Sequence, residues 1–253
     1  MTEVLASYSL VAVYSTMAVY TLAFLLFTLD LARRQSPTPA QQLVALGTER
    51  GASAEEAPLT GSAPVLKMTL FQRLGRALLT VGWVVHLAAT VLRGVAGERV
   101  PWANMFEFGI TATMLIVAVY LGTLFWTDLG YLGAFVSGFV LLSLGIVTVN
   151  FYVDVVPLPP ALQSAWLVIH VFVASLGTAF FALGAGLSVF QLVRDRAERR
   201  DGGLSRLLRS LPDSATLETR AHHLYVIGFV LWTFTLIAGA IWAERAWGRY
   251  WGW

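Results

Sequence analysis

The sequence predicts an all-α protein, a polytopic integral membrane helical bundle of about six transmembrane helices with both termini outside. Hydrophobic residues make up 57% of the 253 residues, and the mean hydropathy is +0.69. This is more apolar side chain than one soluble core can enclose. Charged residues make up only 13%, and the apolar residues are gathered in long runs. Lipid must therefore be the solvent for much of the chain.

Six apolar runs are long enough, or nearly so, to cross a hydrocarbon layer of roughly 30 Å at about 1.5 Å of helix rise per residue. They cover Tyr8–Leu29, Ala77–Leu92, Phe108–Trp126, Leu129–Val153, Trp166–Val193 and Leu224–Ala243. The second run is the shortest, and Arg76 and Arg93 bound it. We expect both arginines to extend their charged ends toward the lipid headgroups.

The positions of the basic residues predict the orientation of the helices. Arginine and lysine are concentrated between the first and second runs and between the fifth and sixth. The opposite side holds only Arg93, Arg99, Arg245 and Arg249. Because positive loops stay in the cytoplasm during insertion, we expect a multi-pass membrane protein with both termini outside and the two basic loops inside.

The chain is expected to form a single membrane domain, residues 1–253, with three distinctive segments. Residues 31–68 are rich in small and polar residues and predict a disordered cytoplasmic tether. Residues 194–221 alternate charges with leucines at helical spacing, which predicts a cytoplasmic loop with a surface helix. Residues 244–253 form a tryptophan-rich segment on the outer side.

Several classes of function are excluded by composition and by motif. The chain has no cysteine, which excludes disulfides, thiolate metal sites and CxxC redox chemistry. A net charge of +2 gives no indication of a nucleic-acid partner. The sequence contains no phosphate-binding loop, GxSxG or HExxH motif, and we predict no catalytic residue.

The first outward-facing feature is the segment 97–108, which places Glu107 at the start of the third run. Asn104 precedes Glu107 by three residues, which is the spacing of a helix N-cap. One interpretation is therefore a purely structural cap. The other is a carboxylate placed for a ligand at the mouth of the helix.

Two histidines lie within apolar runs, where an ionisable group is costly unless it has a task. His170 follows a proline-rich loop near the outer interface, and Trp166 lies four residues earlier on the same helix face. His170 is either a ligand or a hydrogen-bonded packing residue. His86 lies in the middle of the second run, where a neutral imidazole bonded within the bundle is the ordinary explanation and iron ligation is the alternative.

The C-terminus is unusually rich in aromatic residues. Trp242, Trp247, Tyr250, Trp251 and Trp253 are interleaved with glycines. Tryptophan and tyrosine commonly anchor helices at the membrane interface, which is one interpretation. The other is a stacking surface for a planar apolar molecule, with two nearby arginines pairing with its carboxylates. A porphyrin with two propionates fits that description.

Three stretches together resemble the CcsA/ResC family of cytochrome c maturation proteins, the family to which the CcsB-type proteins of actinobacteria belong. These stretches are Pro101–Glu107, Leu162–His170, and Gly239–Trp253 with Gly228 and Phe229 before it. The third is the most specific, because it is similar to the first half of the tryptophan-rich haem-binding signature of that family. The resemblance spans roughly residues 70–253.

The resemblance implies a haem-handling membrane subunit of the System II cytochrome c synthase. Such a subunit binds haem b transiently and non-covalently, and presents it at the outer face for covalent attachment to the CXXCH motif of apocytochrome c. The implied partners are a CcsB/ResB-type membrane protein with a large outer domain, apocytochrome c, haem and the lipid bilayer. The resemblance also implies that the chain acts as part of this haem lyase complex, in the bacterial plasma membrane with its functional face outside.

The resemblance also assigns roles to residues of this sequence. His170 is similar to a histidine of the family that ligates haem iron, and is our candidate metal ligand. The residues similar to the haem platform are Trp247, Gly248, Tyr250, Trp251 and Trp253. The remaining candidate cofactor-binding residues are Trp166, Arg249, Glu107 and His86.

The family signature continues with Asp-Pro-Lys-Glu and further spans that bear a second outer histidine and a histidine within the membrane. The chain therefore resembles a member truncated at its C-terminus, and we expect it to bind haem weakly and to be inactive alone. Two alternatives stay open. One is a six-helix permease or transporter component, which needs polar groups along a central path where this sequence offers little beyond His86. The other is a non-catalytic membrane assembly scaffold.

Overall fold

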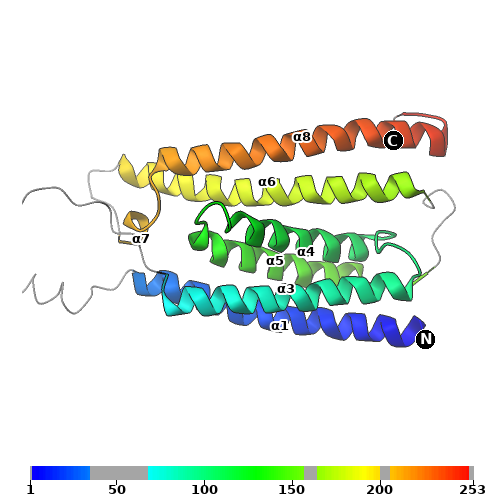
Figure 1. The fold of residues 1–253 in the computed structure, drawn as a ribbon, viewed down its shortest axis with the longest axis horizontal. Coiled ribbons are helices and arrows are strands. Elements are labelled where there is room, and N and C mark those ends of the chain that lie inside the picture. The colour runs from blue at the N-terminus through cyan, green and yellow to red at the C-terminus, as the bar shows by residue number, and fades with distance from the viewer. Residues whose placement is uncertain (1, 35–67, 157–163, 200–205, 251–253) are drawn as a thin grey trace, which may run out of the picture.

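The computed structural model describes residues 2–34, 68–156, 164–199 and 206–250. Within these residues the protein is all-helical, as predicted (Figure 1). The elements are α1 (Thr2–Arg34), α3 (Leu70–Ala96), α4 (Met105–Thr123), the short 3-10 helix η1 (Gly130–Leu132), α5 (Gly133–Phe151), α6 (Ala165–Glu198), α7 (Arg206–Arg209) and α8 (Ser214–Trp247). Six helices of the described part are long and apolar enough to cross a membrane, which confirms the predicted multi-pass bundle.

The six long helices are arranged as three antiparallel pairs. In Figure 1, α1 and α3 lie on one side, α4 and α5 in the middle, and α6 and α8 on the other side. The hydroxyl of Ser9 on α1 donates to the carbonyl of Ala89 on α3 over 2.8 Å. On the other side, the indole of Trp166 on α6 donates to the carbonyl of Ala238 on α8 over 3.1 Å. Each of these hydrogen bonds helps to set the axial register of the two helices within a pair.

Small residues let the helices of each pair approach closely. A Cβ added at Gly82 on α3 would lie 2.6 Å from a ring carbon of Tyr20 on α1. One added at Gly184 on α6 would lie 2.7 Å from a ring carbon of Tyr225 on α8. In lipid there is little hydrophobic drive between helices, so such close packing supplies much of their association energy.

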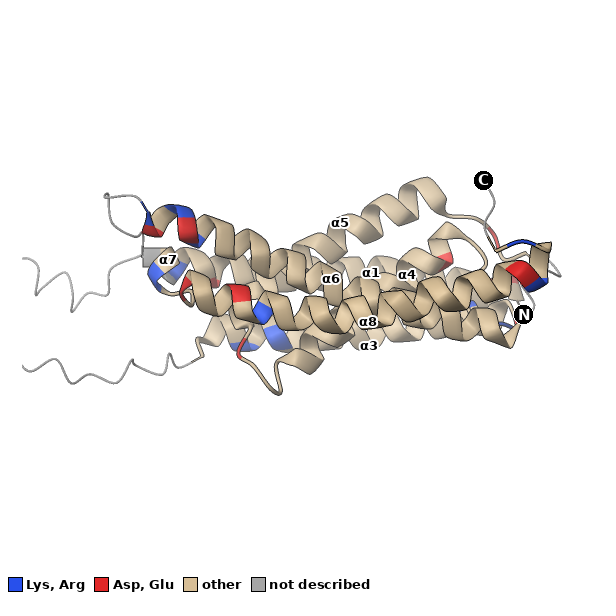
Figure 2. Ribbon diagram, turned by 90° about the horizontal axis from the view of Figure 1, so that it is seen from above, with Lys and Arg blue, Asp and Glu red and all other residues tan. Residues whose placement is uncertain are grey.

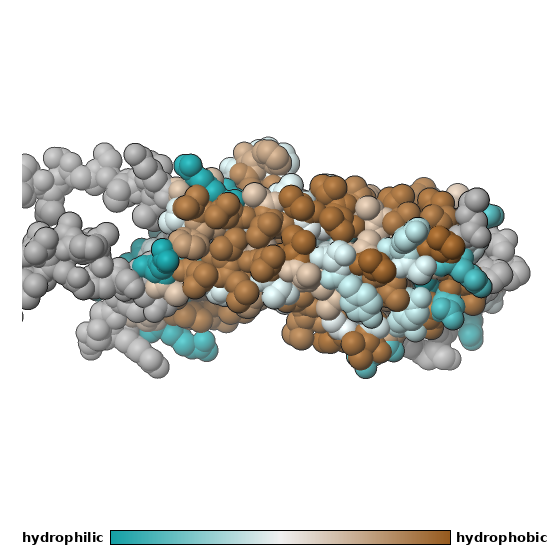
Figure 3. Space-filling view, turned by 90° about the horizontal axis from the view of Figure 1, so that it is seen from below, coloured by the Kyte–Doolittle hydropathy of each residue, from teal (hydrophilic) through white to brown (hydrophobic). Residues whose placement is uncertain are grey.

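The surface of the bundle agrees with lipid as its solvent. Among the described residues, charged residues lie mainly toward the two ends of the bundle, and its middle is almost free of them (Figure 2). Hydrophobic side chains cover most of the middle of the face shown in Figure 3. On α8 the side chains of Phe229 and Val230 are 66% and 62% exposed, which would be costly in water.

The two ends of the bundle carry different parts of the chain. One end of the bundle, which we call the terminal end, holds the first residues of α1 and α6 (Figure 1). The last residues of α3, α5 and α8 lie at the same end. Helices α1 and α6 end, and helices α3 and α8 begin, at the opposite end, which we call the basic end (Figures 1 and 2). The predicted topology, with an even number of spans, requires Thr2 and Trp247 to lie at the same end of the bundle, and they do. Which side of the membrane it faces stays a prediction.

Four of the long helices, α1, α3, α6 and α8, extend beyond the predicted runs at both ends. Helix α3 begins at Leu70 and ends at Ala96, so both arginines that were expected to bound it lie within it. The expectation that Arg93 reaches the headgroups is wrong, because its side chain is 1% exposed and forms an ion pair inside the protein. Arg76 is 23% exposed, and its Nη2 lies 2.8 Å from Oδ1 of Asp128.

Two expected segments lie only partly within the described residues. Of the predicted tether 31–68, residues 35–67 lie outside them, and the preceding residues continue α1. Of the predicted loop 194–221, the first part continues α6 to Glu198 and the last part belongs to α8. The described surface helix is α7, which is four residues long.

Candidate functional site

The terminal end brings together three of the features that the sequence singled out. They are the turn between α3 and α4 with Glu107, the beginning of α6 with His170, and the end of α8 with its aromatic residues. The predicted residue His86 lies elsewhere.

Helix α4 begins with the cap that its sequence predicts. Oδ1 of Asn104 accepts a hydrogen bond from the backbone N–H of Glu107 over 2.9 Å, which confirms Asn104 as the N-cap. The carboxylate of Glu107 accepts from the backbone N–H of Ala103 over 2.9 Å. Glu107 therefore supports the turn before the helix, and its negative charge lies at the positive end of the helix dipole.

The carboxylate of Glu107 is also the centre of a buried ionic cluster, the Arg93–Glu107–Arg99 cluster. Its Oε1 accepts from Nε of Arg93 over 3.1 Å and from Nη2 of Arg99 over 3.2 Å. Its Oε2 accepts from Nη1 of Arg99 over 2.5 Å. Sequence analysis did not find these partners. The available signal was Arg93 at the end of an apolar run, a short turn away from a carboxylate.

The cluster also holds the segment that follows α5. Nη2 of Arg93 donates to the carbonyl of Val153 over 2.6 Å, and Nη2 of Arg99 donates to the carbonyl of Val156 over 3.2 Å. The guanidinium carbon of Arg93 lies 5.2 Å from the ring centroid of Phe106 and 5.7 Å from that of Tyr152. Two arginines thus connect α3, α4 and the end of α5 at one end of the membrane domain.

His170 lies in the interface between α6 and α8. A Cβ added at Gly239 of α8 would lie 2.7 Å from Cε1 of His170, so the imidazole fits against this helix only because residue 239 is glycine. Nδ1 of His170 is buried and has no hydrogen-bond partner among the described residues. Trp166, one turn earlier, also contacts α8, as expected from the four-residue spacing.

The end of α8 presents exposed aromatic rings. The rings of Trp242 and Trp247 lie 4.7 Å apart at 72°, in an edge-to-face arrangement. Trp247 is 58% exposed and Tyr250 56% exposed. Gly248 ends α8 with φ of 68°, a left-handed conformation that glycine adopts without strain.

The other predicted residues of this segment are Arg249, Trp251 and Trp253. Arg249 is exposed, and no ion pair involves it in the described part of the chain. Trp251 and Trp253 lie outside the described residues.

His170 and the aromatic end of α8 lie at the same end of the bundle. Helices α6 and α8 are antiparallel, and His170 packs against Gly239. Trp247 follows Gly239 by eight residues, which is roughly 12 Å along the helix axis. The imidazole of His170 is therefore roughly 12 Å along the axis of α8 from the position of Trp247.

His86 is not part of this group. Its side chain is fully buried in the interface of α1 and α3, and its Nδ1 lies 3.3 Å from the hydroxyl of Tyr20. Seven residues, roughly 10 Å of helix, separate it from Arg93 at the terminal end. The hydrogen-bonded interpretation of His86 thus has a partner, a tyrosine of the neighbouring helix.

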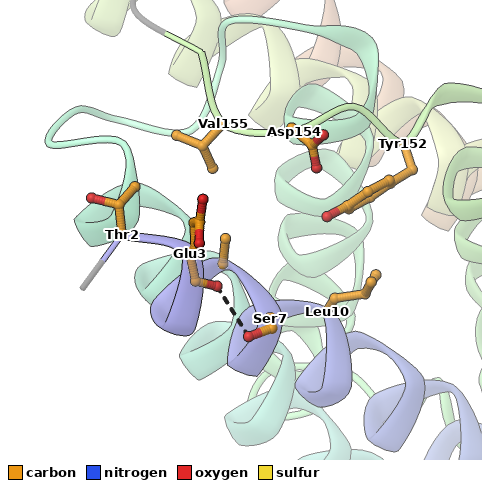
Figure 4. Close-up of a pocket in the computed structure, with 8 residues that line it drawn as sticks. Thr2, Glu3, Ser7, Leu10, Tyr152, Asp154 and Val155 are labelled. Carbon is orange, nitrogen blue, oxygen red and sulfur yellow. Dashed lines mark hydrogen bonds between the residues drawn. The ribbon is translucent and has the colours of Figure 1, made fainter.

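The structure also contains a cavity that the sequence did not indicate. It has a volume of about 390 Å³ and lies at the terminal end, between the start of α1 and the segment after α5 (Figure 4). Its polar lining includes Glu3, Ser7 and Asp154, together with Tyr152, whose ring faces Arg93. None of the predicted site residues lines it. In the described residues, no group of three histidine or acidic side chains is placed to hold a metal ion.

The chain is similar to several proteins named "Cytochrome c biogenesis protein CcsA". It is 33% identical over 180 residues to that of Guillardia theta, covering 64% of this chain and 59% of the relative. It is 36% identical over 118 residues to that of Synechococcus sp. (strain CC9902), covering 38% of each. It is 25% identical over 225 residues to that of Trieres chinensis, covering 72% of this chain and 70% of the relative. The chain thus spans only part of the length of these relatives.

A protein-family model matches the chain from within the turn between α3 and α4 to the last residue. The family model described as "Cytochrome C assembly protein" matches residues 102–253, which include Glu107, His170 and the aromatic end of α8. This range is more than half of the chain, and the chain therefore belongs to the cytochrome c assembly protein family.

Proposed function

We propose that this chain is the haem-handling membrane subunit of a cytochrome c synthase, and that it holds haem at the terminal end of its bundle. Membership of the family supports the broader role in cytochrome c biogenesis. The observation that carries the finer role is the imidazole of His170, which has an unpartnered ring nitrogen at the same end as the exposed indole of Trp247.

In this proposal each group at the terminal end contributes a different contact to haem as cargo. His170 provides an imidazole nitrogen for the iron, and Gly239 leaves the room that the ring needs. Trp247 and Tyr250 provide exposed rings for the macrocycle, and Arg249 provides a cation for a propionate. Trp166 holds α6 against α8 and so positions the imidazole.

The proposed chemistry needs no nucleophile from this chain. In the attachment reaction the S–H of each CXXCH cysteine adds across a vinyl group of haem, forming a C–S and a C–H bond. The subunit contributes position and shielding of the haem. The partners that we propose are apocytochrome c and a CcsB/ResB-type membrane protein with an outer domain.

Permease and scaffold functions are less well supported. A permease needs polar groups that line a path near the middle of the membrane. The buried polar pair there, Tyr20 and His86, forms a contact between two helices and is closed to solvent. Family membership also favours biogenesis over transport.

The test is an absorbance spectrum of the purified chain in detergent after addition of haem. We expect a Soret band in the wild type and its loss in His170→Ala. His222→Ala is the matched control, because His222 is exposed on α8 at the basic end. A band that persists in His170→Ala contradicts the assignment of the ligand. The lack of a band in the wild type favours a permease or a scaffold.

A further inference from the structure

The Arg93–Glu107–Arg99 cluster carries an excess of positive charge in a buried place. The side chains of Arg93 and Glu107 are each 1% exposed, and that of Arg99 is 10% exposed. Two guanidinium groups thus share one carboxylate, which leaves one positive charge unbalanced. Burying an unbalanced charge is unfavourable, because the protein must replace the water that solvated it.

The single carboxylate has no capacity left for further donors. The two oxygens of Glu107 accept from Nε of Arg93, two nitrogens of Arg99 and the backbone N–H of Ala103. A carboxylate offers about four lone-pair sites, so these four bonds use all of them. Any other buried donor near the cluster needs another acceptor.

Four such donors occur between the end of α3 and the start of α4. Arg93 Nη1, Arg99 Nε, Trp102 Nε1 and Asn104 Nδ2 are buried and have no hydrogen-bond partner among the described residues. The rings of Phe106 and Tyr152 lie against the guanidinium of Arg93, but ring faces do not replace an acceptor for an N–H in the guanidinium plane.

The two described acidic residues next to these segments in the sequence do not supply the missing charge. Glu98 and Asp154 are both exposed, and neither forms an ion pair within the described residues. Asp154 lies instead against the cavity beside α1 (Figure 4). Within the described residues, the excess charge and the unpartnered donors therefore leave room for a further acceptor.

We infer that the Arg93–Glu107–Arg99 cluster, with the N–H groups of Trp102 and Asn104, binds one anionic group, a carboxylate or a phosphate. The cluster lies at the terminal end, and the chemistry of the site fits two sources of such a group. One source is a haem propionate, which rests on the proposed function. The other is the phosphate of an anionic lipid, which does not.

The test uses variants that remove an unpartnered donor and keep the ion pairs of Glu107. Trp102→Phe removes Nε1–H and keeps a smaller aromatic ring, a change that the control repeats at an exposed site. Asn104→Ser removes the amide and keeps an oxygen that caps α4 well. The matched control is Trp126→Phe, since Trp126 is 83% exposed in the turn after α4. All are full-length chains in nanodiscs.

Each chain is titrated with haem and with haem dimethyl ester, in which both propionates are neutral. We expect the wild type and Trp126→Phe to bind haem about tenfold more tightly than the ester, and this preference to fall in Trp102→Phe and Asn104→Ser. In parallel, the thermal unfolding of each chain is compared in phosphatidylcholine and in phosphatidylglycerol. Stabilisation by phosphatidylglycerol that is lost in the two variants identifies the lipid as the source.

The outcomes separate this inference from the proposed function. A preference for haem or for phosphatidylglycerol that survives both variants, or no preference for either, overturns the anion site even when the wild type shows a Soret band. If no chain binds haem, the proposed function fails and the lipid comparison alone decides the anion site.

Discussion

Oε1 of Glu107 lies 3.1 Å from Nε of Arg93, and both side chains are buried at the end of a membrane bundle. Fourteen residues separate them, so the contact joins the end of α3 to the beginning of α4. From the sequence alone, a carboxylate in the first turn of a helix is explained as part of the helix cap. Its partners show that it also balances charge that would otherwise be buried alone.

Glu107→Gln tests how much this balance stabilises the protein. The neutral amide leaves two buried guanidinium groups without a counter-charge, and we expect a loss of about 3–5 kcal/mol in the free energy of unfolding. Unfolding in mixed micelles measures it. Asp128→Asn is the control, because Asp128 is 78% exposed and its ion pair with Arg76 contributes less than about 1 kcal/mol. Equal losses in the two variants would contradict the buried role of Glu107.

Gly239→Ala tests the position of His170 without changing the imidazole itself. The new methyl group would lie 2.7 Å from Cε1, so the ring must move or α6 and α8 must separate. We expect a weakened or shifted Soret band and a loss of about 1–3 kcal/mol in stability. Gly177→Ala is the control on the same interface, since its Cβ would meet Leu231 at an ordinary 3.4 Å. An unchanged spectrum in Gly239→Ala would argue against His170 as the iron ligand.

Tyr20→Phe tests the assignment of His86 to helix packing. Removing the hydroxyl leaves a buried imidazole nitrogen without its partner, and we expect a loss of about 1–3 kcal/mol in stability with no change in the haem spectrum. Tyr14→Phe is the control, because Tyr14 is 55% exposed on the same helix. Loss of the Soret band in Tyr20→Phe, with stability intact, would restore His86 as a candidate ligand.

The start of α8 gives a prediction about pH. The Asp213 carboxylate accepts a hydrogen bond from the backbone N–H of Thr216 over 2.7 Å and another from the Thr216 hydroxyl. These hydrogen bonds hold the pKa of the Asp213 carboxyl below its usual value. Because the pKa is lower in the folded state, the charged cap stabilises the protein above about pH 4, and this contribution is lost as the pH falls through the folded pKa.

Asp213→Asn isolates that titration, because asparagine caps a helix about as well and carries no charge. We expect the stability difference between the wild type and this variant to shrink as the pH falls from 6 to 3, while Asp213→Ala loses about 1 kcal/mol or less at pH 6. Thermal unfolding at several pH values measures both. A difference that is constant with pH would show that the carboxylate charge does not contribute.

The helices were predictable because their signal is local. Each span is a run of apolar side chains long enough to cross lipid, and neighbouring residues alone decide that. Their ends were less predictable. Helix α3 includes both Arg76 and Arg93. Each arginine forms an ion pair with a carboxylate from another part of the chain, Arg76 with Asp128 and Arg93 with Glu107, so its charge is compatible with a position inside the helix.

The site was predictable only in part, for the same reason. The N-cap at Asn104 and the common face of Trp166 and His170 follow from spacing within one helix. The pairing of Glu107 with Arg93 and Arg99, and the fit of His170 against Gly239, depend on how separate elements pack. Single residues in the sequence carry no such information.

Composition and the placement of charges by themselves predicted an integral membrane protein with its basic loops on one side of the membrane. They also predicted the six membrane spans that the described residues contain. Those properties follow from the transfer of side chains between water and hydrocarbon, which acts on each segment independently. Only the tertiary structure decided that His86 pairs with Tyr20 inside the bundle, that His170 lies at the aromatic end, and that a buried arginine pair shares Glu107. Contacts between helices decide these matters, because an ionisable group in an apolar medium is stable only where another element brings its partner.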